Sequence, residues 1–324
     1  MMDSAELDLI RSSMRHIVAT ATPFDFAATL SDNGWHDLLD DDPAVAIGLL
    51  GEEVGSQISP LPLLDLVLQH GLAGRIDATT AVLLPPMRRG SDATTAISAV
   101  VDGTELVANG MLLSGHERAR SVWTASIAGV FAIDRSALTT MPLAPHDSEL
   151  GLCASTGRVP VTAVTNPVST SHTWPDALAW GRRANASVLI GSAQKMLDNT
   201  LTYVQQRHQY SRSIGSFQTV KHRLADVHVA IAAARAGVAT AWADRSELSA
   251  QAAAVLAARA QHLAATHCHQ VHGGIAFTVE HGFHRFIRRG QIVSGLLGHP
   301  DDLTREIGQQ ITRLGKVPRT PQLA

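Results

Sequence analysis

The chain contains 324 residues, of which 45% are hydrophobic and 17% are charged. This composition is too apolar for a disordered chain, and the length exceeds that of a usual single domain, so we expect a folded protein with two or three domains. The 26 basic and 29 acidic residues give a net charge of -3, without the positive excess that favours nucleic acid as a partner.

Residues 1–75 show a helical pattern and are expected to form a reduced N-terminal helical domain. Apolar residues recur at spacings of three and four, at Leu7, Ile10, Met14 and Val18. Pro43 and Pro60 are expected to separate short helices, because proline is accepted at a first helical position but blocks a helix through it. The N-terminus lacks a basic region before an apolar run, and no stretch reaches about 18 consecutive apolar residues, so we expect a soluble, cytoplasmic protein without a membrane partner.

Residues 76–170 change to a pattern typical of strands. Alternating apolar residues over 96–101 and 106–108 flank Asp102-Gly103, a pair that is a strong signal for a hairpin turn. Further apolar runs over 122–133 and 159–164 are rich in β-branched residues. We therefore expect a small antiparallel β domain here.

Residues 171–324 return to a helical pattern and are expected to form a four-helix-bundle domain. Helices are predicted over 177–206 and 250–268. Between them, one seam has steps of four and three at Val220, Leu224, Val227, Ile231, Ala234, Val238 and Ala241. The predicted fold class is thus α+β, mainly α.

Cysteine and histidine usage predicts neither disulfide bonds nor a metal site. Cys153 and Cys268 lie far apart and outside any Cys-x-x-Cys arrangement, which fits a reducing compartment. The 16 histidines are spread over the chain. Their densest set has no established ligand spacing and is interpreted as surface or packing residues: His262, His267, His269 and His272.

Two stretches are more specific than composition. The first contains Arg207-His208-Gln209-Tyr210-Ser211 and then Ile214-Gly215-Ser216-Phe217-Gln218, between the first and second long helices. The second is Gln270-Val271-His272-Gly273-Gly274. Each has a plain structural interpretation as well, since Arg207 can be a solvated cation at a helix end and Gly273-Gly274 a simple turn.

In their order and spacing, these motifs resemble the C-terminal half of acyl-CoA dehydrogenases, which have an Arg-x-x-aromatic turn, an Ile-Gly-x-x-Gln helix start and a Gln-x-x-Gly-Gly segment. The resemblance is strong over 177–289 and extends weakly to the order of helices, sheet and bundle. Gly34-Trp35, Leu38-Leu39 and Asp42-Pro43 resemble the shortened β-type subunits of actinobacterial heterotetrameric, steroid-degrading acyl-CoA dehydrogenases.

The resemblance implies that both motifs bind flavin adenine dinucleotide (FAD), shared with a partner subunit that holds most of it. A guanidinium can clamp the diphosphate by charge-assisted hydrogen bonds, glycines let a backbone approach a cofactor, and side-chain amides can donate or accept. The implied cofactor-binding residues are Arg207, Gln209, Tyr210, Ser211, Gln218, Gln270, Gly273 and Gly274.

The positions of the catalytic base look empty. Dehydrogenation of an acyl thioester needs a carboxylate to remove the α proton while the β hydrogen leaves as hydride. The resemblance implies two alternative positions for this base. Counting forward from Arg288, the first falls on Leu297. Counting back from Arg207, the second falls on Gly181. Neither residue can take a proton. Carboxylates nearby in sequence have no predicted direction toward a substrate: Asp176, Glu280, Asp301 and Asp302.

The family motif that contacts the flavin ring from the sheet domain is also mostly missing. Of a Thr-Glu-Pro-x-x-Gly-Ser-like segment, only Gly90-Ser91-Asp92 remains. The half of the flavin site presented to a neighbour is therefore kept, while the ring half and the base are lost.

This asymmetry predicts a non-catalytic or catalytically incomplete β-type subunit that completes the FAD site of a catalytic α subunit, in an α2β2 acyl-CoA dehydrogenase. The resemblance further suggests a steroid-derived acyl-CoA substrate and an electron-transfer flavoprotein as acceptor. Two alternatives remain: a self-contained homotetrameric dehydrogenase with a relocated base, and a cofactor-free scaffold.

Overall fold

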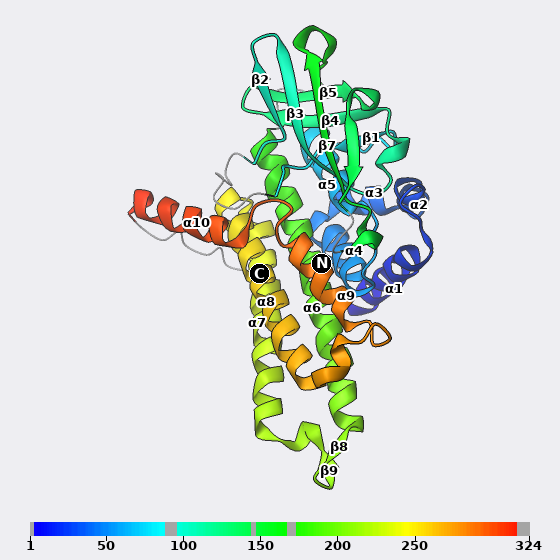
Figure 1. The fold of residues 1–324 in the computed structure, drawn as a ribbon, viewed down its shortest axis with the longest axis vertical. Helices are drawn as coiled ribbons and strands as arrows, with labels where there is room; N and C mark the ends of the chain where they lie inside the picture. Colours follow the sequence, from blue (N-terminus) through cyan, green and yellow to red (C-terminus); the bar gives the residue numbers. More distant parts are fainter. Residues whose placement is uncertain (1–2, 88–95, 144–146, 167–172, 316–324) are drawn as a thin grey trace.

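The computed structural model describes residues 3–87, 96–143, 147–166 and 173–315. Small sheets lie at one end of an elongated molecule, and the long helices of the C-terminal half run from there to the other end (Figure 1). N-terminal helices pack along one side of these long helices (Figure 1). The order of helices, sheets and helical bundle confirms the expected α+β, mainly α fold class.

The described residues of the N-terminal part form five helices: α1 (Ser4–Thr20), α2 (Phe26–Asp32), α3 (Trp35–Asp41), α4 (Pro43–Ser56) and α5 (Leu63–Ala73). Helix α4 begins at Pro43, and the Asp42 carboxylate accepts a hydrogen bond from the Val45 amide at 3.1 Å, which caps the helix. Pro60 lies between α4 and α5. Both prolines therefore separate helices, as the sequence predicted.

Strands fill the region between the two helical parts: β1 (Thr80–Val82), β2 (Ala99–Asp102), β3 (Glu105–Leu112), β4 (Ser121–Ser126), β5 (Gly129–Asp134), β6 (Thr139–Pro142) and β7 (Cys153–Pro160). They form two sheets with the strand orders β1-β4-β5 and β2-β3-β7-β6. The predicted hairpin is confirmed, because Asp102 pairs with Glu105 across a turn in which Gly103 has a φ of 60°.

One pairing differs from the antiparallel expectation. Strand β1 pairs with β4 in parallel, while the other pairings in these two sheets are antiparallel. A parallel pair needs a long connection, and the hairpin β2-β3 in the second sheet supplies it. Alternation of apolar residues identifies a strand but does not encode the direction of its neighbour.

The C-terminal part contains α6 (Trp174–Gln206), the short hairpin β8 (His208–Gln209) and β9 (Arg212–Ser213), α7 (Gln218–Asp244), α8 (Glu247–His272), α9 (Phe283–Val293) and α10 (Pro300–Leu314). The predicted seam of α7 is buried from Leu224 to Ala241, and Val220 is half-buried. Helix α6 packs against α4, α5, α7 and α8.

Helices α4 and α6 touch through their backbones. A β-carbon added at Gly55 would lie 1.9 Å from the Val188 carbonyl oxygen, and one added at Gly191 would lie 2.0 Å from the Glu52 carbonyl oxygen. Larger residues are therefore excluded at both positions. This contact joins the N-terminal helices to the bundle.

Among the described residues, α7 is the one helix whose length and composition would suffice to cross a membrane. A helix in the core of a soluble protein can meet the same criterion.

Candidate functional site

The structure brings the two predicted motifs to the same end of the helical bundle (Figure 1). Arg207 ends α6 and Gln218 begins α7, while Gln270 lies in the last turn of α8. Gly273-Gly274 directly follows α8. We call this region the bundle end.

Contacts across the helices hold the bundle end together. The Thr200 hydroxyl lies 3.1 Å from Nε2 of His272, and the Tyr203 ring stacks on the same imidazole with 4.4 Å between ring centroids. Nδ1 of His267 lies 3.1 Å from the Arg223 carbonyl oxygen. These contacts connect α6 and α7 to the final turns of α8, far apart in sequence.

The turn between α6 and α7 is a tight hairpin. Gln209 pairs with Arg212, which leaves Tyr210 and Ser211 as a two-residue loop with φ angles of 52° and 63°. Positive φ angles at both positions are characteristic of the type I′ turn. Tyr210 is 87% exposed at this tip. The hairpin thus presents the predicted residues to the outside of the chain.

The geometry at the bundle end fits a phosphate-bearing cofactor that approaches from outside. The exposed Arg207 guanidinium has no hydrogen bond or ion pair to another described residue. A β-carbon added at Gly273 or Gly274 would meet no heavy atom within 4 Å, and Gly273 has a φ of 68° that favours glycine. The hydrogen-bond donors of Arg207 and the uncovered backbone at Gly273 and Gly274 are therefore both accessible at the bundle end.

Apolar side chains beside the glycines are also uncovered. Phe277 is 74% exposed and Val279 is 78% exposed, and Ile275 between them and the glycines is about half exposed. Neighbouring exposed apolar side chains are typical of surfaces that contact another chain. The bundle end therefore combines exposed polar groups with exposed apolar side chains.

His272 is a residue of the second motif for which the sequence suggested only packing. Burial, together with the neighbouring His281 and His269, lowers the pKa of His272 to about 4. Among the described residues, no group of three or more His, Cys, Asp and Glu side chains could hold a metal ion. A neutral His272 is thus part of the aromatic packing between α6 and α8.

The two predicted base positions lie against each other. A β-carbon added at Gly181 would lie 2.7 Å from Cδ1 of Leu297 and 2.9 Å from Cδ2 of Leu68. Leu297 is 2% exposed and Leu68 is fully buried. Apolar atoms therefore fill the place that either base would occupy. We call Gly181, Leu297 and Leu68 the closed centre.

The residues around the closed centre are engaged in the structure as well. Arg182 donates from Nε to the Leu297 carbonyl oxygen at 3.2 Å and from Nη1 to the Glu247 carboxylate at 3.3 Å. Glu247 also accepts a hydrogen bond from Gln251 at 3.2 Å. Glu247 thus serves as the counter-ion of a buried arginine, a pairing that sequence spacing could not reveal.

The structure also places the other carboxylates considered from the sequence. Asp176 forms the capping box of α6 with Thr173, and Asp302 is buried and pairs with Arg305 at 2.7 Å. Glu280 and Asp301 are exposed. Asp176 and Asp302 are thus engaged in structural contacts, and Glu280 and Asp301 face solvent.

Asp65 is a buried carboxylate that the sequence did not single out. Burial raises its pKa to about 8, against a hydrogen bond from the Val82 backbone that lowers it. It lies on α5, one turn before Leu68, and faces the sheet rather than the closed centre. Asp65 is thus protonated near neutral pH at the interface between α5 and β1.

A small, mostly apolar cavity lies between α4, α5, α6 and α9. It is lined by Leu64, Val293 and Leu296, among others, and its volume is about 40 Å³. Pockets that bind small ligands have volumes of about 300–1,000 Å³. The cavity is therefore too small for an acyl chain. The remaining ring-side motif, Gly90-Ser91-Asp92, lies outside the described residues.

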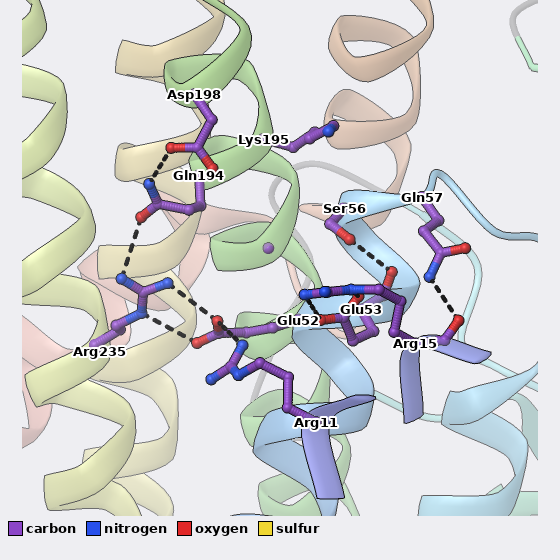
Figure 2. A pocket seen from close by; sticks show the side chains of 11 residues that line it. Arg11, Arg15, Glu52, Glu53, Ser56, Gln57, Gln194, Lys195, Asp198 and Arg235 are labelled. Carbon is purple, nitrogen blue, oxygen red and sulfur yellow. Dashed lines mark hydrogen bonds and ion pairs between the residues drawn. The ribbon is translucent and has the colours of Figure 1, made fainter. Parts of the chain in front are cut away.

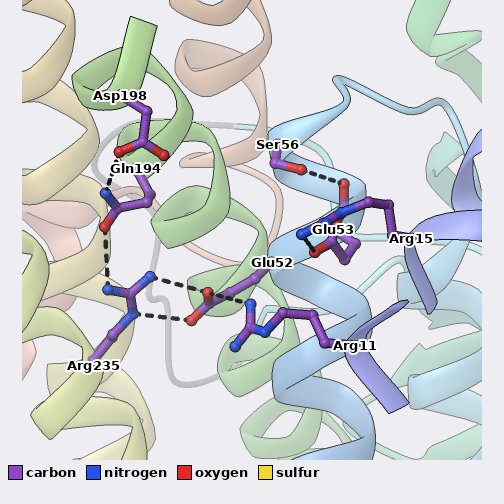
Figure 3. Close-up of polar contacts among 8 residues, drawn as sticks. All are labelled: Arg11, Arg15, Glu52, Glu53, Ser56, Gln194, Asp198 and Arg235. Atoms are coloured by element: carbon purple, nitrogen blue, oxygen red, sulfur yellow. Dashed lines mark hydrogen bonds and ion pairs between the residues drawn. The ribbon is translucent and has the colours of Figure 1, made fainter. Parts of the chain in front are cut away.

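A larger cleft, of about 500 Å³, lies between α1, α4, α6 and α7 and is lined by charged side chains (Figure 2). Glu52 accepts hydrogen bonds from Arg235 at 3.0 and 3.1 Å and from Arg11 at 3.4 Å. Arg15 donates to Glu53 at 3.1 and 3.3 Å (Figure 3). Because arginines of α1 and α7 bind both glutamates of α4, we assign the cleft a structural role in joining these helices.

Comparison with known proteins identifies the C-terminal part of the chain. Residues 174–311 match the family model for the acyl-CoA dehydrogenase C-terminal domain. Over 126 residues the chain is 40% identical to acyl-CoA dehydrogenase IpdE2 of Mycobacterium tuberculosis. This match covers 39% of the chain and 40% of the relative, so it spans less than half of the relative's length.

Two solved structures share the fold over nearly the whole chain. A variant of the Tcur3481-Tcur3483 steroid ACAD is 22% identical, with a TM-score of 0.78 and coverage of 96% of this chain and 99% of that one. The ChsE4-ChsE5 complex from Mycobacterium tuberculosis is 19% identical, with a TM-score of 0.71 and coverage of 98% and 99%. At these identities the matches establish the fold.

Proposed function

We propose that this chain, whose residues 174–311 are an acyl-CoA dehydrogenase C-terminal domain within the fold of that family, is a non-catalytic subunit of a heteromeric, FAD-dependent acyl-CoA dehydrogenase. In this proposal it completes the FAD site of a catalytic α subunit, in an α2β2 assembly. The observation that carries the proposal is the closed centre, where Leu297 and Leu68 lie against Gly181.

Within the part of the chain that the structure describes, the closed centre offers no group to remove the α proton of an acyl thioester. A general base must lie within hydrogen-bond reach of the proton that it abstracts. Leucine and glycine side chains have no basic atom, and the Glu247 carboxylate is bound to Arg182. The catalytic carboxylate is therefore assigned to the partner chain.

The bundle end provides what a shared FAD needs from a second chain. FAD, when bound, accepts the hydride that leaves the β carbon. The unpaired Arg207 guanidinium is suited to hold the diphosphate, and the open backbone at Gly273 and Gly274 lets the cofactor approach. Tyr210, Gln218 and Gln270 are exposed beside this site and are proposed to contact the adenosine side.

The remaining parts of the proposal follow the proteins that this chain resembles. One structural neighbour is described as a steroid ACAD formed by two named components, and another as a complex of two named components. We propose by analogy a steroid-derived CoA thioester as the substrate, an electron-transfer flavoprotein as the acceptor, and a cytoplasmic location.

The proposal is tested by expressing the chain alone and together with candidate α subunits encoded nearby. We expect the lone chain to retain little flavin and to oxidise no acyl-CoA, and the complex to contain both chains, FAD and activity. Native mass measurement and the flavin absorption spectrum provide the readouts. Stoichiometric flavin and turnover in the lone chain would establish the self-contained enzyme instead. Absence of flavin with every partner would favour the cofactor-free scaffold.

The role of Arg207 is tested in the complex by Arg207→Ala. Loss of a charge-assisted hydrogen bond costs about 1.5–3 kcal/mol, so we expect flavin affinity to fall by about 10-fold or more. The matched control is Arg75→Ala, at an exposed arginine between α5 and β1. Equal flavin retention in both variants would remove Arg207 from the site.

A further inference from the structure

A second cleft lies at the opposite end of the bundle from Arg207. Its walls come from the junction of α3 and α4, from α5, from the start of α6 and from the end of α7, and its volume is about 690 Å³. This volume is within the range of pockets that bind small ligands. Arg183, which lines it, lies two residues after Gly181, so its side chain points about 200° around α6 from the closed centre.

Aromatic rings form one wall of this cleft, which we call the tryptophan cleft. Trp180 and Trp242 meet edge to face with 5.1 Å between ring centroids, and His70 lies 5.1 Å from Trp180. The Arg183 guanidinium carbon lies 4.8 Å from the centroid of the Trp242 ring. The wall therefore presents aromatic surface to the apolar part of a ligand, beside the Arg183 cation.

Two buried donors at the tryptophan cleft lack acceptors among the described residues. Arg183 is 2% exposed and uses Nε to donate to the Ala241 carbonyl oxygen at 3.0 Å, but its Nη2 has no partner. Nε1 of Trp242 has none either. An unsatisfied buried donor costs about 1–3 kcal/mol, more for a charged group. A ligand acceptor could recover this cost.

The charged residues that line the tryptophan cleft restrict the charge that a ligand can carry. Four aspartates line the cleft together with the cations Arg183 and Arg245: Asp40, Asp41, Asp42 and Asp176. A ligand with several negative charges would be repelled by this excess of carboxylates. A ligand with one acidic group for the buried donors and one cationic group for the aspartates would satisfy both.

The charged cleft between α1, α4, α6 and α7 provides a contrast. Its glutamates Glu52 and Glu53 are each bound by arginines. In the tryptophan cleft Nη2 of Arg183 and Nε1 of Trp242 have no hydrogen-bond partner among the described residues. The difference lies in the unsatisfied donors, not in the number of charges.

We propose that the tryptophan cleft binds a small zwitterion whose carboxylate accepts hydrogen bonds from Arg183 and Trp242 and whose ammonium group lies toward the aspartates. This site is separate from the bundle end and does not depend on the function proposed above. A chain that binds no flavin could still bind such a ligand.

The proposal is tested by isothermal titration calorimetry of the full chain with 6-aminohexanoate. Hexanoate and hexylamine are the matched probes, since each keeps the same carbon chain but only one charged group. We expect saturable binding of 6-aminohexanoate that is at least 10-fold tighter than that of either control. No saturable binding, or equal binding of hexanoate, would overturn the proposal.

Variants locate the binding. Trp242→Phe keeps the ring and removes the donor, and we expect it to weaken 6-aminohexanoate binding about 5- to 10-fold. Trp123→Phe, the same change on strand β4 away from the cleft, should leave the affinity unchanged. Asp41→Asn is a second variant at an exposed position, for use if Trp242→Phe does not fold. We expect it to weaken 6-aminohexanoate binding about 3-fold. Unchanged affinity in the cleft variants would refute this location.

Discussion

The closed centre and the bundle end differ in what covers the residues that the family pattern marks. At the closed centre, Leu297 and Leu68 are packed against Gly181 with no room for a further atom. At the bundle end, Gly274 has no heavy atom within 4 Å of an added β-carbon, and the Arg207 guanidinium has no partner within the described chain. The chain thus fills the predicted base position with its own apolar side chains and leaves the glycines of the predicted cofactor position uncovered.

The largest effect is expected from a carboxylate placed in the closed centre. Leu297→Glu buries a charge among apolar side chains and should destabilise the chain by about 3–5 kcal/mol or prevent folding. Leu297→Met conserves volume and should cost less than about 1.5 kcal/mol. Urea unfolding of both variants measures the difference. If Leu297→Glu were stable and gained acyl-CoA oxidation, the centre would not be closed.

A pair of glycine substitutions compares the two regions directly. Gly181→Ala forces a β-carbon against Leu297 and Leu68, and overpacking of this kind costs about 1–3 kcal/mol. Gly274→Ala enters open space at a residue without a positive φ and should change the free energy of unfolding by less than about 0.5 kcal/mol. Denaturant titration of the two variants provides the test. Equal costs would show that the regions are packed alike.

Helix α5, which carries Leu68 of the closed centre, also carries Asp65 and should make the free energy of unfolding depend on pH. Asp65 has a folded-state pKa of about 8, above the unfolded value of about 4, so its stabilising contribution is complete below pH 4 and is lost as pH rises toward 8. The slope is at most about 1.4 kcal/mol per pH unit. Asp65→Asn should flatten this slope. Urea titrations of the variant and of the unaltered chain, between pH 5 and pH 8 at equal ionic strength, measure the difference. Parallel curves would place the titration elsewhere.

The bundle end should show a pH dependence of opposite sign over a narrower pH range. His272 has a folded-state pKa of about 4, below the ordinary value of about 6.5, so its contribution is present above pH 6.5 and is lost as pH falls toward 4. His272→Phe keeps an aromatic ring beside Tyr203 and should remove the acid-side dependence. Thermal unfolding between pH 4.5 and pH 7 measures it. An unchanged profile would mean that another group titrates.

Much of the fold could be predicted from local patterns. The seam from Leu224 to Ala241 recurs every three to four residues because one face of α7 is buried, and such spacing is visible in the sequence. Pro43 marks the start of α4 for an equally local reason. The parallel pairing of β1 with β4 was not predicted, because strand direction depends on the path of the chain between them.

The family resemblance was confirmed for the C-terminal domain and for the fold, whereas the cofactor residues, the division into domains and the partner role stay predictions. Counting along the sequence located Gly181 and Leu297 separately. It could not predict that Glu247 pairs with Arg182, or that Nη2 of Arg183 and Nε1 of Trp242 lack acceptors among the described residues, since these side chains come from different helices.

The sequence by itself determined which residue types stand at the base and cofactor positions, because identity and spacing are properties of the chain. The tertiary structure alone decided that the two base positions meet and are filled by Leu297 and Leu68, and that the cofactor positions remain uncovered. Packing and exposure arise from contacts between segments more than 100 residues apart, and these contacts are fixed only when the helices assemble.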